Sequence, residues 1–309
     1  MAKTGVGPLC RLFGKTRQAH YQKLLYFREQ AANSMLVLDL VAALRREIPG
    51  LGTKKLYLLL QNSFRKSGIK MGRDKLHKLL QTHNLTIRVT RKLPKTTNSN
   101  HWMKKYPNLI KELEVTTTEQ VWVCDLTYVC VGKDFNYLSL ITDAHSRMII
   151  GYFLHQFLSA DGCIKALDMA ISSRNKTGLS VIHHSDRGSQ YCSFQYVQKL
   201  KEANIEISMT DNGDPYENAM AERVNGILKT DFKLNRIFKN HMEALLAVEI
   251  SINNYNQLRP HMSCNYMTPF EAHCLDEPLI KRWKSNKSKQ SAAPPASPVW
   301  VREAGGAEQ

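Results

Sequence analysis

The spacing of apolar residues along the chain changes near residue 121. Before residue 85, apolar side chains recur every three or four residues, which is typical of amphipathic helices. From residue 121 onwards, runs rich in β-branched and aromatic residues predict strands, separated by helix-like segments. The predicted strands are 121–131, 137–144, 147–155, 180–184 and 205–209. The predicted helices among and after them are 160–172, 194–204, 217–232 and 241–256.

The strand-containing part, residues 118–275, has a recognisable order of elements. Its first three strands are joined by the short connections GKDFN and HS, which predicts an antiparallel meander. Three antiparallel strands followed by alternating helices and strands is the order of an RNase H-like fold. We therefore expect an α/β domain with a five-stranded mixed sheet and helices. Residues 276–309 drift into Lys, Ser, Ala and Pro, which predicts a disordered tail.

The first residues of the chain form a helix-turn-helix candidate. Within residues 1–32, a short helix is followed by a turn at Gly14 and a second helix that Thr16 caps. Arg17 stands at the start of this second helix, where a recognition helix would carry it. A helix-glycine-helix pattern is more often a packing unit, so both interpretations stay open.

Residues 33–85 predict a second small helical domain. Its first helix carries apolar Leu36, Leu38, Leu40, Val41 and Leu44. Thr53 caps the next helix, and a bend at Ser67-Gly68 precedes a third helix over 73–83. Three short helices with basic residues near their starts resemble a DNA-binding helix-turn-helix. A plain helical bundle fits nearly as well. Residues 86–117 read as a basic linker that can lie along phosphates.

The net charge of the chain is concentrated in its first third. Residues 1–100 hold 20 Lys and Arg against 4 Asp and Glu, so they carry 20 − 4 = +16, and the remaining 23 of each sign cancel. Such asymmetry favours a polyanion-binding module joined to a neutral domain, over a solvated basic face without a ligand. The cations that we expect to contact DNA here are Arg17, Lys54, Lys55, Arg73, Lys75 and Lys78.

Composition excludes several other classes of protein. The seven cysteines show no CxxC spacing, which argues against a disulfide framework and a zinc ribbon, and fits reduced thiols. No apolar run approaches the ~18 residues of a membrane helix. The first fifteen residues lack the apolar segment of a secretory signal. We therefore expect a cytoplasmic protein with no membrane partner.

Three acidic residues stand at positions where this fold can bring them together. Asp125 interrupts the apolar strand VWVCDLTYV, and Asp186 directly follows the strand SVIHH, at its carboxyl end. Glu222 lies on a helix whose apolar residues cluster on the opposite side. The polar side of that helix, which we expect to face away from the core, carries Asn218, Glu222, Asn225 and Lys229. Taken singly, each acid is more simply a cap, an ion-pair partner or a solvated side chain.

Taken together, the three acids predict a metal site. Two divalent cations ~4 Å apart need several carboxylate oxygens, and they stabilise both the attacking and the leaving oxygen of a phosphodiester exchange. His183 and His184 precede Asp186, but they have no Cys or His partners at zinc-ligand spacing. We expect these two histidines to be structural or to support the carboxylates.

Several stretches resemble the integrase core of bacterial insertion-sequence transposases. They are WVCDLTYV (122–129), HHSDRGSQY (183–191), NGDPYENAMAERVNGILK (212–229) and YNQLRPHMSCNYMTPFEAH (255–273). The 222 − 186 − 1 = 35 residues between Asp186 and Glu222 match the spacing of that group and of retroviral integrases. The chain is similar to the second-frame product of elements with two overlapping reading frames, over roughly residues 8–275. Thr268, Pro269 and Glu271 also predict a capping box for a last helix.

The resemblance implies specific roles for some residues. Asp125, Asp186 and Glu222 would be catalytic, with Asp125 bridging two Mg²⁺ ions, for which Mn²⁺ is expected to substitute. Lys229, two helical turns after Glu222, would contact DNA phosphate. Gly188 would allow a tight turn beside Asp186, and Gln190 or Tyr191 would position the substrate. For Arg259 and His261, in the arginine-proline-histidine signature, packing and function are equally good interpretations.

The implied activity is metal-dependent cleavage and strand transfer at the ends of an insertion sequence. The expected partners are terminal inverted repeats, target DNA, further copies of this chain on paired ends, and an upstream-frame protein, with the enzyme acting at the bacterial nucleoid. Asp231 departs from the family, in which a longer Glu is expected. Two alternatives remain: a DNA-binding regulator with a decayed catalytic domain, and a nuclease of the same fold that only hydrolyses.

Overall fold

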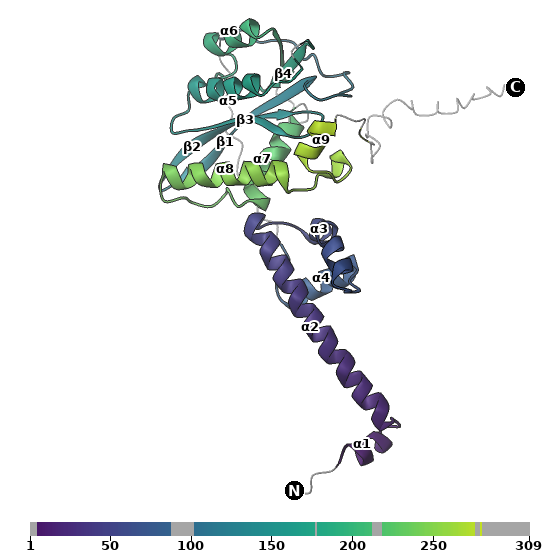
Figure 1. Ribbon diagram of the computed structural model, residues 1–309. Helices are drawn as coiled ribbons and strands as arrows, with labels where there is room; N and C mark the ends of the chain where they lie inside the picture. Colours follow the sequence, from purple (N-terminus) through teal and green to yellow (C-terminus); the bar gives the residue numbers. More distant parts are fainter. Residues whose placement is uncertain (1–4, 88–101, 177, 212–217, 276–278, 280–309) are drawn as a thin grey trace, which may run out of the picture.

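The computed structural model describes residues 5–87, 102–176, 178–211, 218–275 and 279 (Figure 1). Its α/β domain is built on a five-stranded sheet in the order β3-β2-β1-β4-β5. The strands are β1 (Val121–Val131), β2 (Asp134–Asp143), β3 (Ile149–His155), β4 (Val181–Ser185) and β5 (Ile205–Met209). β1 pairs antiparallel with β2 and parallel with β4. This mixed sheet confirms the predicted RNase H-like topology.

Helices cover both faces of the sheet (Figure 1). α5 (Ala160–Ser172) and α6 (Phe194–Glu202) bury one face, where Trp122 and Cys124 of β1 join their core. α7 (Ala219–Asp231) and α8 (His241–Gln257) cover the other face. Side chains alternate along a strand, so Asp125 points to the α7 side while its neighbour Cys124 points to α5 and α6. The chain then forms a short 3-10 helix (Met262–Cys264) and α9 (Pro269–Leu275).

The last helix begins with the predicted capping box. The amide of Thr268 donates to Glu271 Oε2 at 2.8 Å, and the amide of Glu271 donates back to Thr268 Oγ1 at 3.2 Å. Both otherwise unpaired backbone donors are thereby satisfied at the start of α9. Side-chain bonding at this helix start was therefore predictable from four residues of sequence.

The amino-terminal helices differ from the prediction in the extent of α2. α1 (Val6–Leu12), α2 (Arg17–Glu47), α3 (Thr53–Lys66) and α4 (Arg73–Thr82) are present, with Gly14 in the left-handed conformation that its turn requires. However, α2 is one helix of 31 residues, so the boundary drawn at residues 32 and 33 falls inside it. The segment Arg28–Asn33 contains neither Gly nor Pro, and nothing in it interrupts the helix.

Side-chain caps at these helix starts follow the prediction only in part. Thr16 caps α2, because its Oγ1 accepts from the amide of Ala19 at 3.0 Å. Thr53 was expected to cap α3, but Gly52 holds that position. The hydroxyl of Thr53 instead lies 3.2 Å from His77 Nδ1 of α4, so it links the two helices. A cross-helix partner competes with a local cap, and sequence alone does not reveal it.

We call residues 5–87 the helical module. Its core consists of Val37, Val41, Leu56, Leu60, Phe64, Leu76 and Leu80. The loop after α2 docks on the α/β domain: the Gly50 amide donates to the Asp231 carbonyl at 2.6 Å. Asn254 of α8 donates to Glu47 Oε2 at 3.0 Å. A Cβ built on Gly50 would lie 2.3 Å from the carbonyl oxygen of Thr230, so only glycine allows this approach.

Parts of two predicted segments lie outside the described residues. Of the basic linker predicted at 86–117, residues 88–101 are not described, and of the tail predicted at 276–309 only residue 279 is. Across the parts of the chain that the structure describes, no helix is both long and apolar enough to cross a membrane.

Candidate active site and DNA interface

The structure brings Asp186 and Glu222 close enough to Asp125 for their charges to act on it, beside the carboxyl end of β4. Asp125 lies within β1, Asp186 follows the last residue of the neighbouring parallel strand β4, and Glu222 is in the first turn of α7. Asp125 is half-buried. Its pKa is raised from 3.8 to about 7, first by burial and then by the negative charge of Asp186, with a smaller contribution from Glu222. The three carboxylates therefore share one electrostatic environment.

Two hydrogen bonds oppose this rise and fix the orientation of Asp125. Its Oδ1 accepts from the amide of Leu126 at 2.9 Å, and its Oδ2 accepts from Asn225 Nδ2 at 2.7 Å. Both bonds favour the charged carboxylate and lower its pKa. Asn225 stands one turn after Glu222 on α7, so the same helix supplies an acid and the group that orients the acid opposite it.

The polar side of α7 corrects one expectation. We expected it to face away from the core, but Asn218 and Asn225 are buried, and Asn218 Nδ2 donates to the carbonyl of Cys124 at 3.1 Å. Glu222 is exposed and Lys229 half-buried on the same side. The polar stripe thus lies against β1 and closes the site, because asparagine can be buried wherever strand backbone and carboxylate groups satisfy it. A helical wheel cannot distinguish this case from a solvated face.

The turn after β4 shapes the surroundings of Asp186. The amide of Gly188 donates to Asp186 Oδ1 at 2.9 Å, and a Cβ at position 188 would lie 3.0 Å from the same oxygen. The expected tight turn at Gly188 is therefore present. Gln190 is half-buried, whereas Tyr191 is only 3% exposed. The centre of its ring lies 5.5 Å from that of Tyr196, so Tyr191 is a core residue, and of the two candidates for positioning substrate the structure favours Gln190.

The two histidines before Asp186 are structural, as expected. His183 Nε2 lies 2.8 Å from both Cys124 Sγ and the Tyr196 hydroxyl. Burial, together with the neighbouring His184, lowers the pKa of His183 to about 3, so its ring stays neutral. His184 Nδ1 is 2.8 Å from Ser208 Oγ, which joins β4 to β5. These contacts hold the strand that ends at Asp186.

Lys229 lies within the electrostatic field of the carboxylates. Burial lowers its pKa, while the charge of Asp125 acts in the opposite direction. No described carboxylate forms an ion pair with its ammonium group. A half-buried cation beside a carboxylate cluster is a suitable contact for a phosphate that enters the site.

The cations predicted to contact DNA in the helical module divide into two groups. Arg17, Arg73, Lys75 and Lys78 are exposed, and Arg73 forms a surface ion pair with Asp74 at 2.9 Å. Lys54 and Lys55 instead lie at the start of α3, next to the α/β domain. Lys54 Nζ is 5.1 Å from the centre of the Tyr266 ring, and Lys55 Nζ is 3.7 Å from Asp231 Oδ2.

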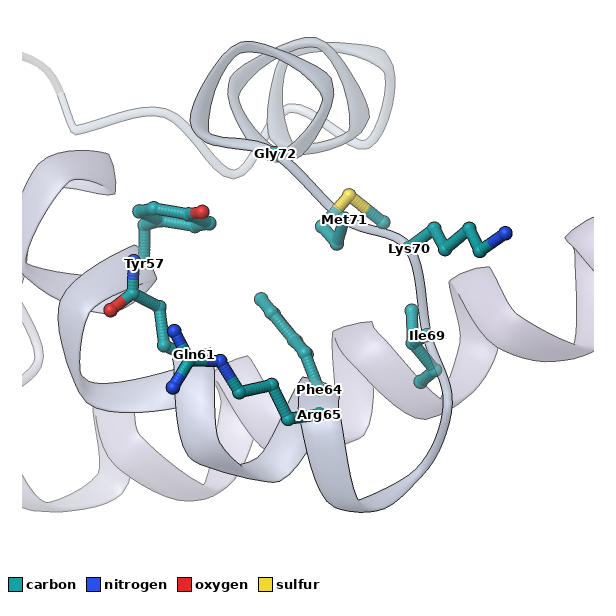
Figure 2. A pocket seen from close by; sticks show the side chains of 8 residues that line it. All are labelled: Tyr57, Gln61, Phe64, Arg65, Ile69, Lys70, Met71 and Gly72. Atoms are coloured by element: carbon teal, nitrogen blue, oxygen red, sulfur yellow. The ribbon is translucent and has the colours of Figure 1, made fainter.

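A pocket of about 360 Å³ opens in the helical module between α3 and the bend that leads into α4 (Figure 2). Its lining is Tyr57, Gln61, Phe64, Arg65, Ile69, Lys70, Met71 and Gly72. Arg65 and Lys70 contribute two cations to this lining, and Lys70 lies two residues before Gly72, the N-cap residue of α4. The pocket therefore belongs to the part of the module that carries the helix-turn-helix prediction.

The carboxyl end of α7 carries the residues whose role the sequence left open. Arg259 is 2% exposed, and its Nε and Nη2 both lie 2.9 Å from Asp231 Oδ2. Asp231 thus anchors α7 to the segment after α8 while its carbonyl receives Gly50 of the helical module. Burial and four neighbouring cations, of which Arg259 acts most strongly, lower the pKa of His261 to about 3. For Arg259 the structure favours the packing interpretation.

Within the described ranges, no three His, Cys, Asp or Glu side chains already converge closely enough to hold one metal ion. The carboxylates of Asp125 and Asp186 are instead hydrogen-bonded to the protein. Their donor chemistry nevertheless suits a hard cation, because Mg²⁺ and Mn²⁺ prefer carboxylate oxygens. The mutual repulsion that raises the pKa of Asp125 is the kind of repulsion that a divalent cation relieves.

Comparison with known proteins identifies the family of this chain. Two models of the integrase core domain match residues 116–215 and 203–269. An uncharacterized 31 kDa protein of insertion element IS600 from Shigella sonnei is 34% identical, over 84% of this chain and 96% of that one. The transposase for insertion sequence element IS629 from Shigella sonnei is 31% identical, over 67% of this chain and 69% of its own length. This chain belongs to the insertion-sequence transposases.

Other relatives of this transposase are more distant. Transposase InsF for insertion sequence IS3A from Escherichia coli strain K12 is 30% identical over 62% of this chain and 66% of its own length. Among solved structures, the HTLV-2 integrase catalytic core domain has a TM-score of 0.41 at 19% identity, and covers 51% of this chain and 97% of that chain. The transposase is a polynucleotidyl transferase that acts on DNA, as its family does.

Proposed function

We propose that this transposase cleaves the ends of its insertion sequence and joins the freed 3′ hydroxyl groups to target DNA by a two-metal mechanism. Asp125, Asp186 and Glu222 would hold the ions, with Mg²⁺ as the natural metal and Mn²⁺ as a substitute. The observation that supports this most strongly is the placement of the acids: Asp125 lies on β1 and Asp186 follows the neighbouring strand β4, while Asn225, one turn after Glu222 on α7, donates to Asp125 at 2.7 Å. The negative charges of Asp186 and Glu222 also raise the pKa of Asp125, after burial as the main cause, although the three acids are far apart in the sequence.

When bound, a pair of such ions stabilises the attacking and the leaving oxygen of a phosphodiester exchange. The contribution of the protein is to orient and to neutralise. Asn225 and the Leu126 amide hold the two oxygens of Asp125, and the Gly188 amide holds one oxygen of Asp186. Lys229 would bind a non-reacting phosphate beside them. Water or a DNA 3′ hydroxyl is the nucleophile, so no covalent intermediate with the enzyme is needed.

The helical module would recognise the terminal inverted repeats. Support comes from its excess of positive charge and from the three exposed cations on α4, Arg73, Lys75 and Lys78. Because a transposition event handles two ends, we propose that the enzyme works as a homo-oligomer on paired ends. An upstream-frame partner protein and action at the bacterial nucleoid belong to the same proposal.

The proposal is tested by a strand-transfer assay with labelled element-end DNA. Asp125→Asn, Asp186→Asn and Glu222→Gln keep the shape of each side chain but remove its charge. Each should reduce joining at least a thousandfold, because a hard cation loses its anionic ligand. Chelation of divalent metal should do the same to the wild-type protein. Titration with element-end DNA should give near wild-type affinity for all three variants.

A matched control is Asp168→Asn. Asp168 lies on α5, on the opposite face of the sheet, and its carboxylate forms a solvent-exposed ion pair with Lys199. This variant should join DNA as the wild type does. Full joining activity in any of the three variants would remove that residue from the site. Cleaved ends without joined products would identify a hydrolytic nuclease, and tight binding without either product would identify a regulator.

A further inference from the structure

Cations from both parts of the molecule meet beside α7, outside the carboxylate site. We call them the cationic seam: Lys54, Lys55, Arg147, Arg223 and Arg259. Lys54 reaches over the ring of Tyr266, whose amide donates to the His261 carbonyl at 2.9 Å. Arg147 Nε donates to Ser263 Oγ at 3.2 Å in the same loop. The seam therefore runs from the start of α3, across the loop at 261–267, to α7.

The positive charges of the cationic seam outnumber the carboxylates that form ion pairs with them in the described residues. Asp231 pairs with Arg259 and Lys55. Among the residues that the structure describes, no carboxylate forms an ion pair with Lys54, Arg147 or Arg223. The charges of Arg259 and Arg223 both contribute to lowering the pKa of Lys55 to about 8, after burial as the main cause. Like charges held together in this way are stabilised when an anion binds.

A purely structural role explains only part of this arrangement. Asp231 and its two partners account for the docking of the helical module on α7. Lys54 and Arg223 take no part in that ion-pair network, and both are exposed. Arg223 directly follows Glu222 on α7, about 100° around the helix, so the two side chains lie on adjacent faces of one helix. Neither the helix-turn-helix prediction nor the carboxylate site uses Arg223.

We propose that the cationic seam binds the phosphodiester backbone of DNA and guides the reacting strand past Glu222. Lys54 and Arg223 make the contacts from opposite sides, the first from the helical module and the second from the catalytic helix. Positive charge on an exposed surface with unbalanced cations is complementary to a polyanion, and this family acts on DNA. The proposal rests on the proposed function, because it assigns the path of DNA to the same active site.

The test uses the full-length chain with Lys54→Ala, Arg223→Ala and the double variant. Matched controls are Lys165→Ala, Lys201→Ala and their double variant, which remove the same charge from α5 and α6 on the opposite face of the sheet. DNA affinity is titrated at several salt concentrations. Loss of two phosphate contacts should reduce the log–log salt slope by about 2, since each contributes ~0.9. The control pair should keep the wild-type slope.

Two DNA probes distinguish the possible sources of the phosphates. One is an element end that stops at the cleavage position, and the other continues into flanking duplex. A reduced slope on both probes assigns the seam to the element end. A reduced slope on the longer probe alone assigns it to DNA beyond the end. Wild-type slopes on both probes for the Lys54→Ala/Arg223→Ala variant would overturn the proposal.

Joining assays separate this inference from the proposed function. The double alanine variant should join element ends at least tenfold more slowly with an unchanged thermal midpoint. Lys54→Arg/Arg223→Lys should recover most of the rate, because a phosphate contact requires charge before shape. If the wild-type protein itself fails to join DNA with Mg²⁺, the proposed function fails. If the wild type joins and the double alanine variant matches it, only the seam proposal fails.

Discussion

The helical module and the α/β domain place their charged residues differently. On α4 of the module, Arg73, Lys75 and Lys78 project into solvent. In the α/β domain, Asp125 is half-buried beside Asp186, and its pKa is raised to about 7. Exposed cations cost little folding free energy and attract a polyanion over a distance. Buried like charges oppose folding, and their retention indicates a chemical role.

The helical module and the α/β domain meet at Asp231, whose carboxylate forms largely buried ion pairs. Asp231 receives Arg259 and Lys55 through its side chain and Gly50 through its backbone. This contact links the module that would bind an element end to the helix that carries Glu222. We therefore expect substitutions at this junction to lower the free energy of unfolding much more than substitutions at ion pairs on the surface.

The largest effect is expected for Asp231→Ala. It leaves the buried guanidinium of Arg259 without its only ion-pair partner among the described residues, and loss of one member of a buried pair costs about 3 kcal/mol or more. The free energy of unfolding, measured with urea, should fall by that amount. Asp168→Ala, which removes the exposed partner of Lys199, should change it by less than about 1 kcal/mol. Equal losses in the two variants would contradict the distinction between junction and surface.

A smaller effect is expected for Gly50→Ala. The added Cβ would collide with the backbone of Thr230 and Asp231, and overpacking of this kind costs about 1–3 kcal/mol. Joining activity should fall as well, because the same collision displaces the end of α7. Gly226→Ala is the control within α7, since nothing lies within 4 Å of its added Cβ. That change should stabilise the helix by up to about 1 kcal/mol.

The smallest effect on stability, with a clear effect on activity, is expected for Lys229→Ala. The free energy of unfolding should change by less than about 0.5 kcal/mol, because the side chain is only half-buried and forms no described ion pair. Strand transfer should fall at least tenfold, and Lys229→Arg should retain more activity than Lys229→Ala. Wild-type joining rates in Lys229→Ala would make this lysine a merely solvated residue.

The catalytic sheet could be predicted closely from the sequence. β1 and β5 have the predicted bounds, and so does α5, because strand propensity and helical periodicity agree with burial there. The long α2 was divided in two because residues 28–34 carry no large apolar side chain, so the apolar pattern is interrupted in the middle of the helix. Its residues are nevertheless good helix formers without a breaker. An interruption of the apolar pattern therefore does not mark the end of a helix when the residues in between are helix formers.

The carboxylates were also accessible from the sequence, whereas their supporting residues were not. Asp125 stood out because it interrupts an apolar strand. Asn225 was placed on the side of the helix that faces away from the core, since a helical wheel does not contain the strand that Asn225 contacts. The roles of Asp231, Gly50 and Lys55 depend on contacts between distant segments, and no local pattern encodes them.

The claim that Asp125 belongs to a metal-holding set is tested most directly by thermal unfolding between pH 5 and pH 9, with and without Mn²⁺. The folded protein holds a proton on Asp125 up to pH about 7, whereas the unfolded chain releases it near 3.8. This stabilisation is complete below pH 4 and is lost as the pH rises through 7. The metal-free wild type should therefore lose stability between pH 5 and pH 8 relative to Asp125→Asn, whose amide does not titrate.

At pH 8, Mn²⁺ should raise the midpoint of the wild-type protein by several degrees, because binding to the folded state alone stabilises it. Asp125→Asn and Glu222→Gln should gain far less, and Asp168→Asn should gain as much as the wild type. Equal Mn²⁺ stabilisation of the wild type and Asp125→Asn, with parallel pH profiles in the absence of metal, would contradict the account.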